Sequence, residues 1–335
     1  MKAVTFGEIM LRLNPHGHDR FLQTNEFVTN FAGAEANVAL SLSNYGIESH
    51  YITKLPDHEI GQMAINSLRR YGVHTENIVR GGERIGILFL EKGAAQRGSK
   101  VIYDRKYSSF YASEAQDYDW ENILHGADWF HFTGITPALG QNIVEALTAA
   151  LEVCKRNNIT VSCDLNYRSK LWTPEECSAV MTKLMPYVDV LVANEEHADI
   201  IFGIKPQNAQ PSTKEAYASV AKQLYEKFGL KSSVITIRES ITADDNRWGA
   251  MVYDGNDSYF SEMYTMHMVD RVGSGDAFCG AFIYTQMANF NSRDAIDFSV
   301  AAGVLKHSIE TDFNLVSTDE VWKLVKFGGN GRTAR

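Results

Sequence analysis

Short apolar runs alternate with amphipathic stretches along this chain of 335 residues. The runs have the length and β-branched content of buried strands, and residues 142–158 and 176–188 between them repeat apolar side chains at helical spacing. Strands that alternate with helices predict an α/β fold, with a mostly parallel central sheet and helices on both faces. We expect strands within residues 3–11, 50–55, 127–132, 159–166, 188–196 and 232–240.

Two stretches break this alternation, because their strand-like runs are joined by polar turns without a crossover helix. They predict antiparallel ribbons, at about residues 10–32 and 84–112, inserted as a lid into a single domain that spans residues 1–335. A two-stranded ribbon alone is marginally stable, so the mouth of an active site, a second subunit or both should cover these ribbons. We therefore expect a homodimer joined through the lid, or a higher homo-oligomer.

Composition narrows the class of protein. The apolar content of 44% and charged content of 22% are those of a globular protein, and the formal charge of -9 disfavours a nucleic-acid partner. The four cysteines form no CxxC pair, the first residues include Glu8 and Arg12 rather than a signal peptide, and no apolar run reaches transmembrane length. We expect a cytoplasmic enzyme with no membrane partner.

The segment VDRVGSGDAF, residues 269–278, places two glycines and Asp276 at the start of an expected helix. Free backbone N–H groups at such a start can hold an anion. The segment does not fit the dinucleotide fingerprint GxGxxG, because Phe278 occupies the third glycine position. An ionised Asp276 could instead take the proton of a hydroxyl that attacks a phosphoryl group, while the amides of Gly273, Ser274 and Gly275 hold the developing charge. The alternative is that Asp276 only caps the helix.

At this point a resemblance becomes specific. Residues 270–282, DRVGSGDAFCGAF, resemble the C-terminal signature of the ribokinase-like (PfkB) carbohydrate kinases, commonly D-T-x-G-A-G-D, with Arg271 and Ser274 in place of threonine and alanine. Residues 30–46, NFAGAEANVALSLSNYG, resemble their other glycine-rich signature, and the match extends over nearly the whole chain in the family's order. The segments GEIMLRLNP, DLNYRSKLW and ETDFN are most similar to those of the family's 2-keto-3-deoxygluconate kinases.

The resemblance implies a ribokinase-like fold and, with ATP and Mg²⁺, phosphorylation of the terminal 6-hydroxyl of 2-keto-3-deoxygluconate. It leaves open the C4 epimer, the oligomer size and a requirement for a monovalent cation. Kinases of fructose or of 2-keto-3-deoxygalactonate are the nearest alternatives. A nucleotide-binding dehydrogenase and a non-catalytic sugar sensor are alternatives from other classes.

The substrate is expected to meet two arginines. Strand alternation places Val101, Tyr103, Arg105 and Tyr107 on one face of the second ribbon, and Arg168 follows an expected strand. Guanidinium groups bind carboxylates bidentately, although each arginine alone could equally form a surface ion pair. The resemblance implies substrate contacts at Gly33, Asn37, Phe89 (often a tyrosine in related sugar-acid kinases), Tyr103, Arg105, Arg168, Asp276 and Asp312. Arg12 stands where many sugar kinases of the family carry a hydroxyl-binding aspartate, which disfavours ribose and nucleosides.

The nucleotide is expected beside the ends of later strands. Its candidate contacts are Asn166, Asn194, Thr236, Arg238, Gly273 and Gly275. The family's N-x-x-E motif begins at Asn194, but His197 stands in place of the glutamate that helps to order water around the metal. A neutral imidazole is a poor partner for hydrated Mg²⁺. No metal ligand is therefore assigned, and Glu195 and Glu196 remain candidates that would act through water.

Overall fold

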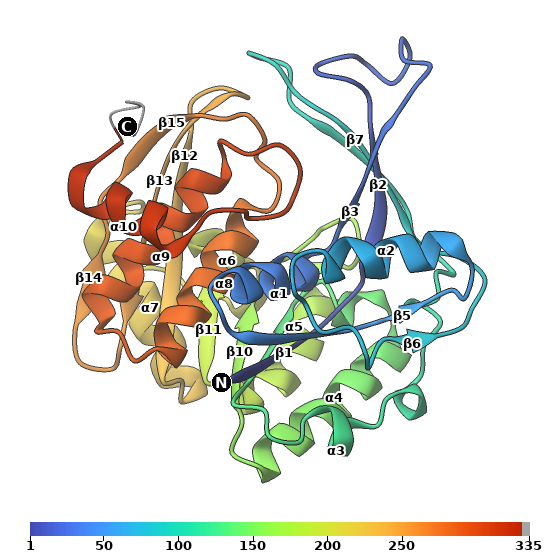
Figure 1. Ribbon diagram of the computed structural model, residues 1–335. Helices are drawn as coiled ribbons and strands as arrows, with labels where there is room; N and C mark the ends of the chain where they lie inside the picture. The colour runs from blue at the N-terminus through green and yellow to red at the C-terminus, as the bar shows by residue number, and fades with distance from the viewer. Residues whose placement is uncertain (330–335) are drawn as a thin grey trace.

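A nine-stranded sheet forms the centre of the computed structural model, which describes residues 1–329 (Figure 1). Its strands, in spatial order, are β14 (Ser258–Phe260), β13 (Asp245–Tyr253), β12 (Ser232–Ser240), β11 (Val190–Ala193), β10 (Thr160–Asp164), β9 (Trp129–Thr133), β1 (Lys2–Phe6) and β4 (Glu48–Ile52), and β15 (Tyr264–His267) also pairs with β13. The strands from β12 to β4 are parallel, and the pairs made by β13 are antiparallel. All six expected strand regions contain strands of this sheet.

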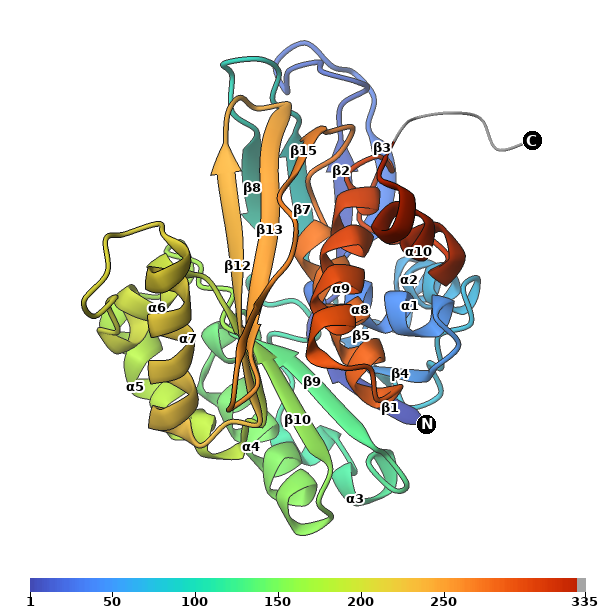
Figure 2. The same ribbon diagram turned by 90° about the vertical axis from the view of Figure 1, so that its left-hand side faces the viewer.

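Helices cover both faces of the sheet (Figure 2). One face carries α1 (Ala34–Asn44), α2 (Glu59–Arg69), α8 (Ser274–Met287), α9 (Ser292–Lys306) and α10 (Thr318–Phe327). The other face carries α3 (Trp120–Ile123), α4 (Gln141–Arg156), α5 (Pro174–Leu184), α6 (Glu195–Phe202) and α7 (Lys214–Phe228). The expected α/β class is therefore confirmed. Among the described residues, no helix combines the length and the apolar character needed to cross a membrane.

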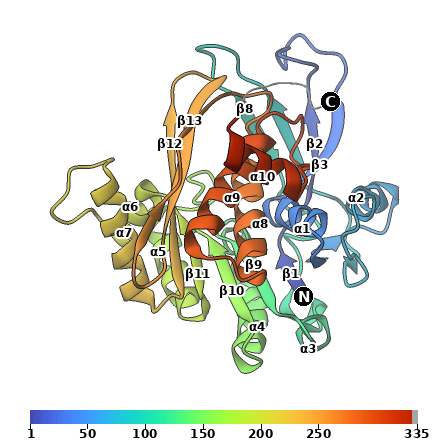
Figure 3. The same ribbon diagram turned by 60° about the vertical axis from the view of Figure 1, so that its left-hand side comes forward.

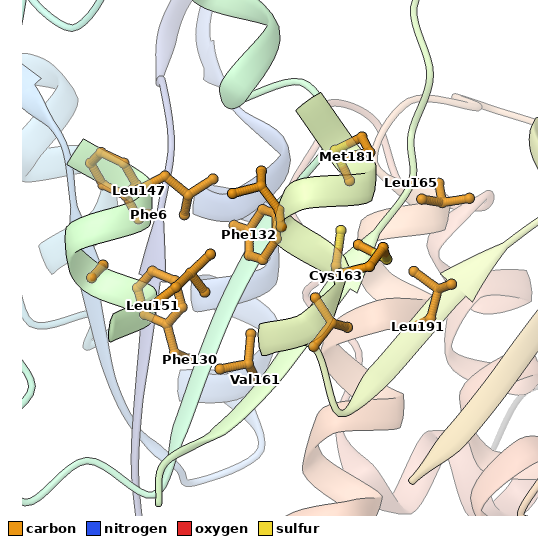
Figure 4. Close-up of a cluster of buried hydrophobic side chains, with 14 of the residues drawn as sticks. Phe6, Phe130, Phe132, Leu147, Leu151, Val161, Cys163, Leu165, Met181 and Leu191 are labelled. Carbon is orange, nitrogen blue, oxygen red and sulfur yellow. The ribbon is translucent and has the colours of Figure 1, made fainter. Parts of the chain in front are cut away.

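The larger core lies between the sheet and helices α4 to α7. Figure 4 shows Phe130 and Phe132 of β9 against Leu147 and Leu151 of α4, with all four side chains buried. The neighbouring strand β10 contributes Cys163 to the same cluster, and the four cysteines of the chain are all buried and unpaired. Burial on both faces explains why the parallel strands are almost continuously apolar in the sequence.

The two expected ribbons combine into a second sheet. It contains β3 (Val28–Ala32), β2 (Met10–Asn14), β7 (Ile87–Glu91) and β8 (Lys100–Asp104) in that order, and a parallel pair between β2 and β7 joins the ribbons. This lid sheet rises beyond the carboxyl ends of the parallel strands (Figures 1 and 3). The expectation that Tyr107 shares one strand face with Val101, Tyr103 and Arg105 is wrong. Strand β8 ends at Asp104, and Tyr107 has a left-handed backbone (φ 62°) with its side chain in solvent.

Arg12 of the lid strand β2 connects the lid sheet to the rest of the molecule. Its guanidinium is fully buried and donates to the carboxylates of Asp270 (2.8 Å) and Asp312, while its Nε donates to Asn14 (2.9 Å). Asp270 opens the turn before α8, and Asp312 lies in the loop between α9 and α10. Burial acts to raise the pKa of Asp270, but the Arg12 charge and the Val272 amide outweigh burial and hold this pKa below its usual range.

Replacement of Arg12 by methionine should destabilise the fold strongly, because it removes the cation that is hydrogen-bonded to two buried carboxylates and leaves only the longer contact of Lys92 with Asp270 (3.8 Å) as an ion pair to either of them. We expect a loss of about 3 kcal/mol in the free energy of unfolding, measured from the midpoint of urea denaturation. Arg247→Met is the matched control: it breaks an exposed pair with Glu239 (2.8 Å) and should cost less than about 1 kcal/mol. Equal midpoint shifts in the two variants would contradict the role given to Arg12.

Candidate active site

A cleft of about 1060 Å³ lies between the lid sheet and the carboxyl ends of the parallel strands. In open parallel sheets this edge is where ligands bind. Most of the candidate residues line the cleft: Gly33, Asn37, Tyr103, Asn166, Arg168, Asn194, Glu195, Glu196, Thr236, Arg238, Gly273, Ser274, Gly275, Asp276 and Asp312. Residues far apart in the sequence, from β3 to the loop after α9, therefore meet in one place.

The glycine turn at the start of α8 presents free backbone amides to this cleft. Gly273 is the N-cap residue, it has a left-handed backbone (φ 80°), and no side chain caps the helix. A Cβ at Gly273 would lie 2.1 Å from the carbonyl oxygen of Asp312, so no other residue fits there. A Cβ at Gly275 would meet no atom within 4 Å, because the cleft opens in front of it. An anion can therefore approach the first-turn amides and the positive end of the helix dipole.

Asp276 projects from the first turn of α8 and does not cap the helix. Its Oδ2 accepts a hydrogen bond of 2.7 Å from Nδ2 of Asn37 on α1. Burial raises the pKa of Asp276 to about 7, the Asn37 hydrogen bond opposes this shift, and the negative charge of Asp164 adds to it. The capping alternative from the sequence is therefore wrong, and the carboxyl group titrates in the range useful for a general base.

Asp164, at the end of β10, is a site residue that sequence reasoning did not select. It lines the cleft, accepts from the backbone N–H of Asn166 (3.1 Å), and has the thiol of Cys279 at 3.8 Å from its carboxylate. Burial raises its pKa to about 6, although the nearby Arg168 charge lowers it. The available signal was its position as the last residue of a parallel strand, two residues before Asn166.

Three arginines face the same cleft without an acidic partner. Arg168, Arg238 and Arg271 all line it, and none of them forms an ion pair with another described residue. Burial and the charges of Arg271 and Arg168 lower the pKa of Arg238 to about 10, so it remains charged at neutral pH. Like charges held together repel, which makes this cluster a favourable place for a polyanion.

The start of α6 supplies side-chain oxygen atoms of the kind that bind metal ions, on the same side of the cleft as the arginine cluster. The Oδ1 of Asn194 caps this helix by accepting from the backbone N–H of His197 (2.6 Å). Burial, reinforced by the Arg168 charge, lowers the pKa of His197 to about 4, so its imidazole is neutral at pH 7. Glu195 and Glu196 line the cleft beside it. These carboxylates, unlike the neutral imidazole, are hard oxygen donors of the kind that Mg²⁺ prefers.

A smaller cavity of about 270 Å³ adjoins the cleft beneath the lid. Both share Tyr103 and Arg168 in their linings, and the smaller cavity adds Arg105 and Lys170. Arg105 is buried and its Nε donates to Glu8 (2.8 Å), so part of its guanidinium already has a carboxylate partner. Lys170 was not selected from the sequence, although it lies two residues after Arg168.

One expected substrate contact, Phe89, needs correction, and another, Asp312, lies in the cleft with its carboxylate already paired. Phe89 does not line either cavity, because strand alternation turns Leu88 and Leu90 toward the cleft and Phe89 to the outer face of the lid sheet. There it packs against Phe21 (6.5 Å between ring centroids) and Phe27 (6.0 Å). Asp312 does reach the cleft, but its carboxylate is engaged by Arg12. Asp312 therefore holds the lid and the glycine turn together rather than offering a free carboxylate.

A half-buried carboxylate, an uncapped helix start and an arginine cluster in one cleft define a phosphoryl-transfer site of the small-molecule kinase kind. The model of the pfkB family of carbohydrate kinases matches residues 1–308, and the chain belongs to this family. It is therefore a carbohydrate kinase, and the expected ribokinase-like fold is confirmed.

Individual proteins that are similar to this chain are also named as sugar kinases. The crystal structure of a 2-dehydro-3-deoxygluconokinase from Thermotoga maritima has a TM-score of 0.94 and 49% identity, and covers 97% of this chain and 98% of its own. A 2-dehydro-3-deoxygalactonokinase from Haloferax volcanii is 33% identical over 98% of both chains. A putative ribokinase II from E. coli, in complex with ATP and Mg²⁺, has a TM-score of 0.81 at 21% identity, covers 97% of this chain and 99% of its own, and shows the shared fold.

Substitution of Asp276 by asparagine should nearly abolish turnover while ATP still binds, because an amide fills the same space but cannot accept a hydroxyl proton. We expect kcat to fall by about 10²–10⁴-fold, measured by ADP release, with the ATP dissociation constant unchanged by calorimetry. A variant that keeps more than about a tenth of the wild-type rate would show that Asp276 is not the base.

Proposed function

We propose that this chain transfers the γ-phosphoryl group of ATP to the terminal 6-hydroxyl of 2-keto-3-deoxygluconate, giving 2-keto-3-deoxy-6-phosphogluconate and ADP. The observation that carries the proposal is the position of Asp276: its carboxylate, held by Asn37, shares one cleft with free helix amides, and that cleft adjoins a cavity lined by Arg105, Arg168 and Lys170. The first group of residues suits phosphoryl transfer, and the second suits a sugar that carries a carboxylate.

Asp276 and the glycine turn would share the chemical step. The ionised carboxylate accepts the hydroxyl proton as the sugar oxygen forms its bond to the γ-phosphorus, and the bond from that phosphorus to the bridging oxygen breaks to release ADP. The amides that follow Gly273 stabilise the charge on the phosphoryl oxygens during the transfer. Asn37 keeps the carboxylate oriented through its 2.7 Å hydrogen bond.

The nucleotide would lie along Arg238 and Arg271 of the arginine cluster. We assign its contacts to Asn166, Asn194, Thr236, Arg238, Gly273 and Gly275, and add Arg271, whose guanidinium lines the same cleft. The cleft oxygen donors Asp164, Glu195 and Glu196 fit a hydrated Mg²⁺ that accompanies the nucleotide. That ion, when bound, neutralises phosphate charge, which the unpaired arginines also do from the protein side.

The sugar would lie under the lid, beside Gly33 and Tyr103. Its carboxylate would be held in the smaller cavity by Arg168, whose guanidinium has no acidic partner, and by Arg105. We propose that the whole chain acts as one catalytic unit whose lid sheet closes over this substrate. We also propose that it works in the cytoplasm, because its four thiols are unpaired, as is usual in a reducing compartment.

The C4 epimer 2-keto-3-deoxygalactonate is the alternative substrate, since one relative of 33% identity is named for it. ADP release with ATP and a panel of both epimers, 5-keto-2-deoxygluconate and fructose tests the proposal. The expected result is the highest kcat/KM with 2-keto-3-deoxygluconate. A clear preference for fructose would overturn the sugar-acid assignment, and the absence of ADP release with every sugar would overturn the kinase assignment.

Replacement of Arg168 by alanine should separate sugar acids from neutral sugars. The arginine gains a charge-assisted hydrogen bond only when the substrate carries a carboxylate. We expect kcat/KM to fall about ten- to a hundredfold for 2-keto-3-deoxygluconate and hardly at all for fructose. Lys170→Ala is a companion variant at the rim of the same cavity and should have a smaller effect of the same kind.

Equal losses for both sugars would show that Arg168 serves the phosphates instead.

Arg105→Lys is a gentler test at the second arginine than alanine, because it leaves a cation beside the buried Glu8. It should keep only part of the wild-type kcat/KM for 2-keto-3-deoxygluconate, since an ammonium group cannot reproduce the two-pronged hydrogen bonding of a guanidinium.

We also propose that two copies pair through the outer faces of their lid sheets. Phe89 and Ile102 lie opposite each other on that face, beside Phe27, and the side chains of Ile102 and Phe27 are exposed in the single chain. Light scattering at micromolar concentration should give a dimer for the wild type and a monomer for Ile102→Asp. A monomeric wild type, or an unaffected dimer in the variant, would contradict this interface.

A further inference from the structure

A cluster of histidine and glutamate side chains lies at the edge of the main sheet, outside the cleft. His50 is in the edge strand β4, and His74 lies in the segment after α2 that runs alongside it. The backbone N–H of His74 donates to Ser49 (2.8 Å), and that of Tyr51 donates to the carbonyl oxygen of His74 (3.1 Å). The two histidines are thus opposite each other across this pair of extended segments, and their side chains share one face.

Each histidine has a carboxylate beside it. His50 Nε2 lies 3.0 Å from Glu48, which is two residues away on the same face of β4, and His74 Nδ1 lies 3.6 Å from Glu76. The imidazole rings stack with 4.5 Å between centroids and 17° between planes. One ligand atom from each of His50, His74 and Glu76 lies within 4.8 Å of the others. Two imidazoles and a carboxylate form a ligand set found in zinc sites.

One ring nitrogen of His50 is available to a cation. The Nδ1 of His50 is buried and has no hydrogen-bond partner. With Glu48 accepting from Nε2, the free lone pair lies on Nδ1, as in carboxylate–histidine–metal arrangements.

We propose that Glu48, His50, His74 and Glu76 form a binding site for a divalent transition-metal ion of the Zn²⁺ type. His50, His74 and Glu76 are the ligands, and Glu48 orients His50 or completes the coordination. Tetrahedral Zn²⁺ places its ligand atoms about 3.4 Å apart, so ligand atoms that now lie within 4.8 Å of one another must close by up to about 1.4 Å, and the His74 ring must turn out of its stack with His50 to direct its lone pair at the ion. The exposed side chain of Glu76 and the half-exposed side chain of His74 are free to make that movement.

The ion would fasten the edge strand β4 to the segment that follows α2. Mg²⁺ should not compete, because it prefers an all-oxygen set of ligands. The chain's thiols should not compete either, since its four cysteines are buried in the folded protein. The site is separate from the proposed kinase reaction, so neither proposal depends on the other.

The test is calorimetric titration of Zn²⁺ into untagged, EDTA-treated protein at pH 7.5. We expect one saturable site per chain in the wild type, and affinity at least about tenfold weaker in His74→Gln, a substitution of a half-exposed side chain that should not disturb folding. The matched control is the double variant His16→Gln/His18→Gln, which removes a second histidine pair in the lid turn and should bind Zn²⁺ like the wild type.

At Zn²⁺ about a hundredfold above its dissociation constant, the wild-type Tm should rise by about 4 °C and that of His74→Gln should not.

Co²⁺ substitution gives a second readout, because a tetrahedral site of nitrogen and oxygen ligands has visible absorption without the thiolate charge-transfer band. Three results would overturn the proposal: no saturable binding in the wild type at millimolar Zn²⁺, an unchanged isotherm in His74→Gln, or an equal loss in the lid control. Activity in the ADP assay should be the same in wild type and His74→Gln, so that failure of this site and failure of the kinase assignment are distinguishable.

Discussion

The buried Arg12 guanidinium is the contact on which the arrangement of the cleft depends. It joins a strand of the lid sheet to Asp270, at the beginning of the glycine turn, and to Asp312, whose carbonyl oxygen lies directly behind Gly273. The position of the anion-binding amides is therefore coupled to the position of the lid. A buried cation with two carboxylates is costly to assemble and more costly to leave incomplete, and this favours a single geometry for the three segments.

The remaining electrostatics of the cleft follow from its division into an acidic floor and a basic side. Asp276 and Asp164 lie in the floor, where burial raises the pKa of both carboxyl groups, and the Asp164 charge raises that of Asp276 further. Arg168, Arg238 and Arg271 lie on the basic side without carboxylate partners. Such a site is strained when empty, and a polyphosphate with its metal ion relieves both kinds of repulsion at once.

Much of this was predictable from the sequence, and the failures have physical causes. The parallel strands and the turn at residues 269–278 were recognisable because buried strands are continuously apolar and glycines mark a backbone that other residues cannot adopt. Phe89 was wrongly expected to contact the substrate because resemblance gives a position in a strand, while side-chain direction depends on the register of β7. The partners of Arg12 could not be foreseen, since Asp270 and Asp312 lie 258 and 300 residues away and only the folded chain brings them together. Asp164 was missed because one aspartate at a strand end carries no pattern of its own.

The most direct measurement is the pH dependence of kcat/KM for 2-keto-3-deoxygluconate in the wild type and in Asp164→Asn. A base acts only when ionised, so activity should fall as the pH drops through the pKa of Asp276, which burial raises to about 7. Removal of the Asp164 charge should move that acid limb to lower pH, because the repulsion that helps to raise the pKa of Asp276 is gone. A wild-type profile that is flat from pH 5.5 to 8.5, or a limb that does not move in Asp164→Asn, would contradict the account of Asp276 as a base tuned by its neighbours.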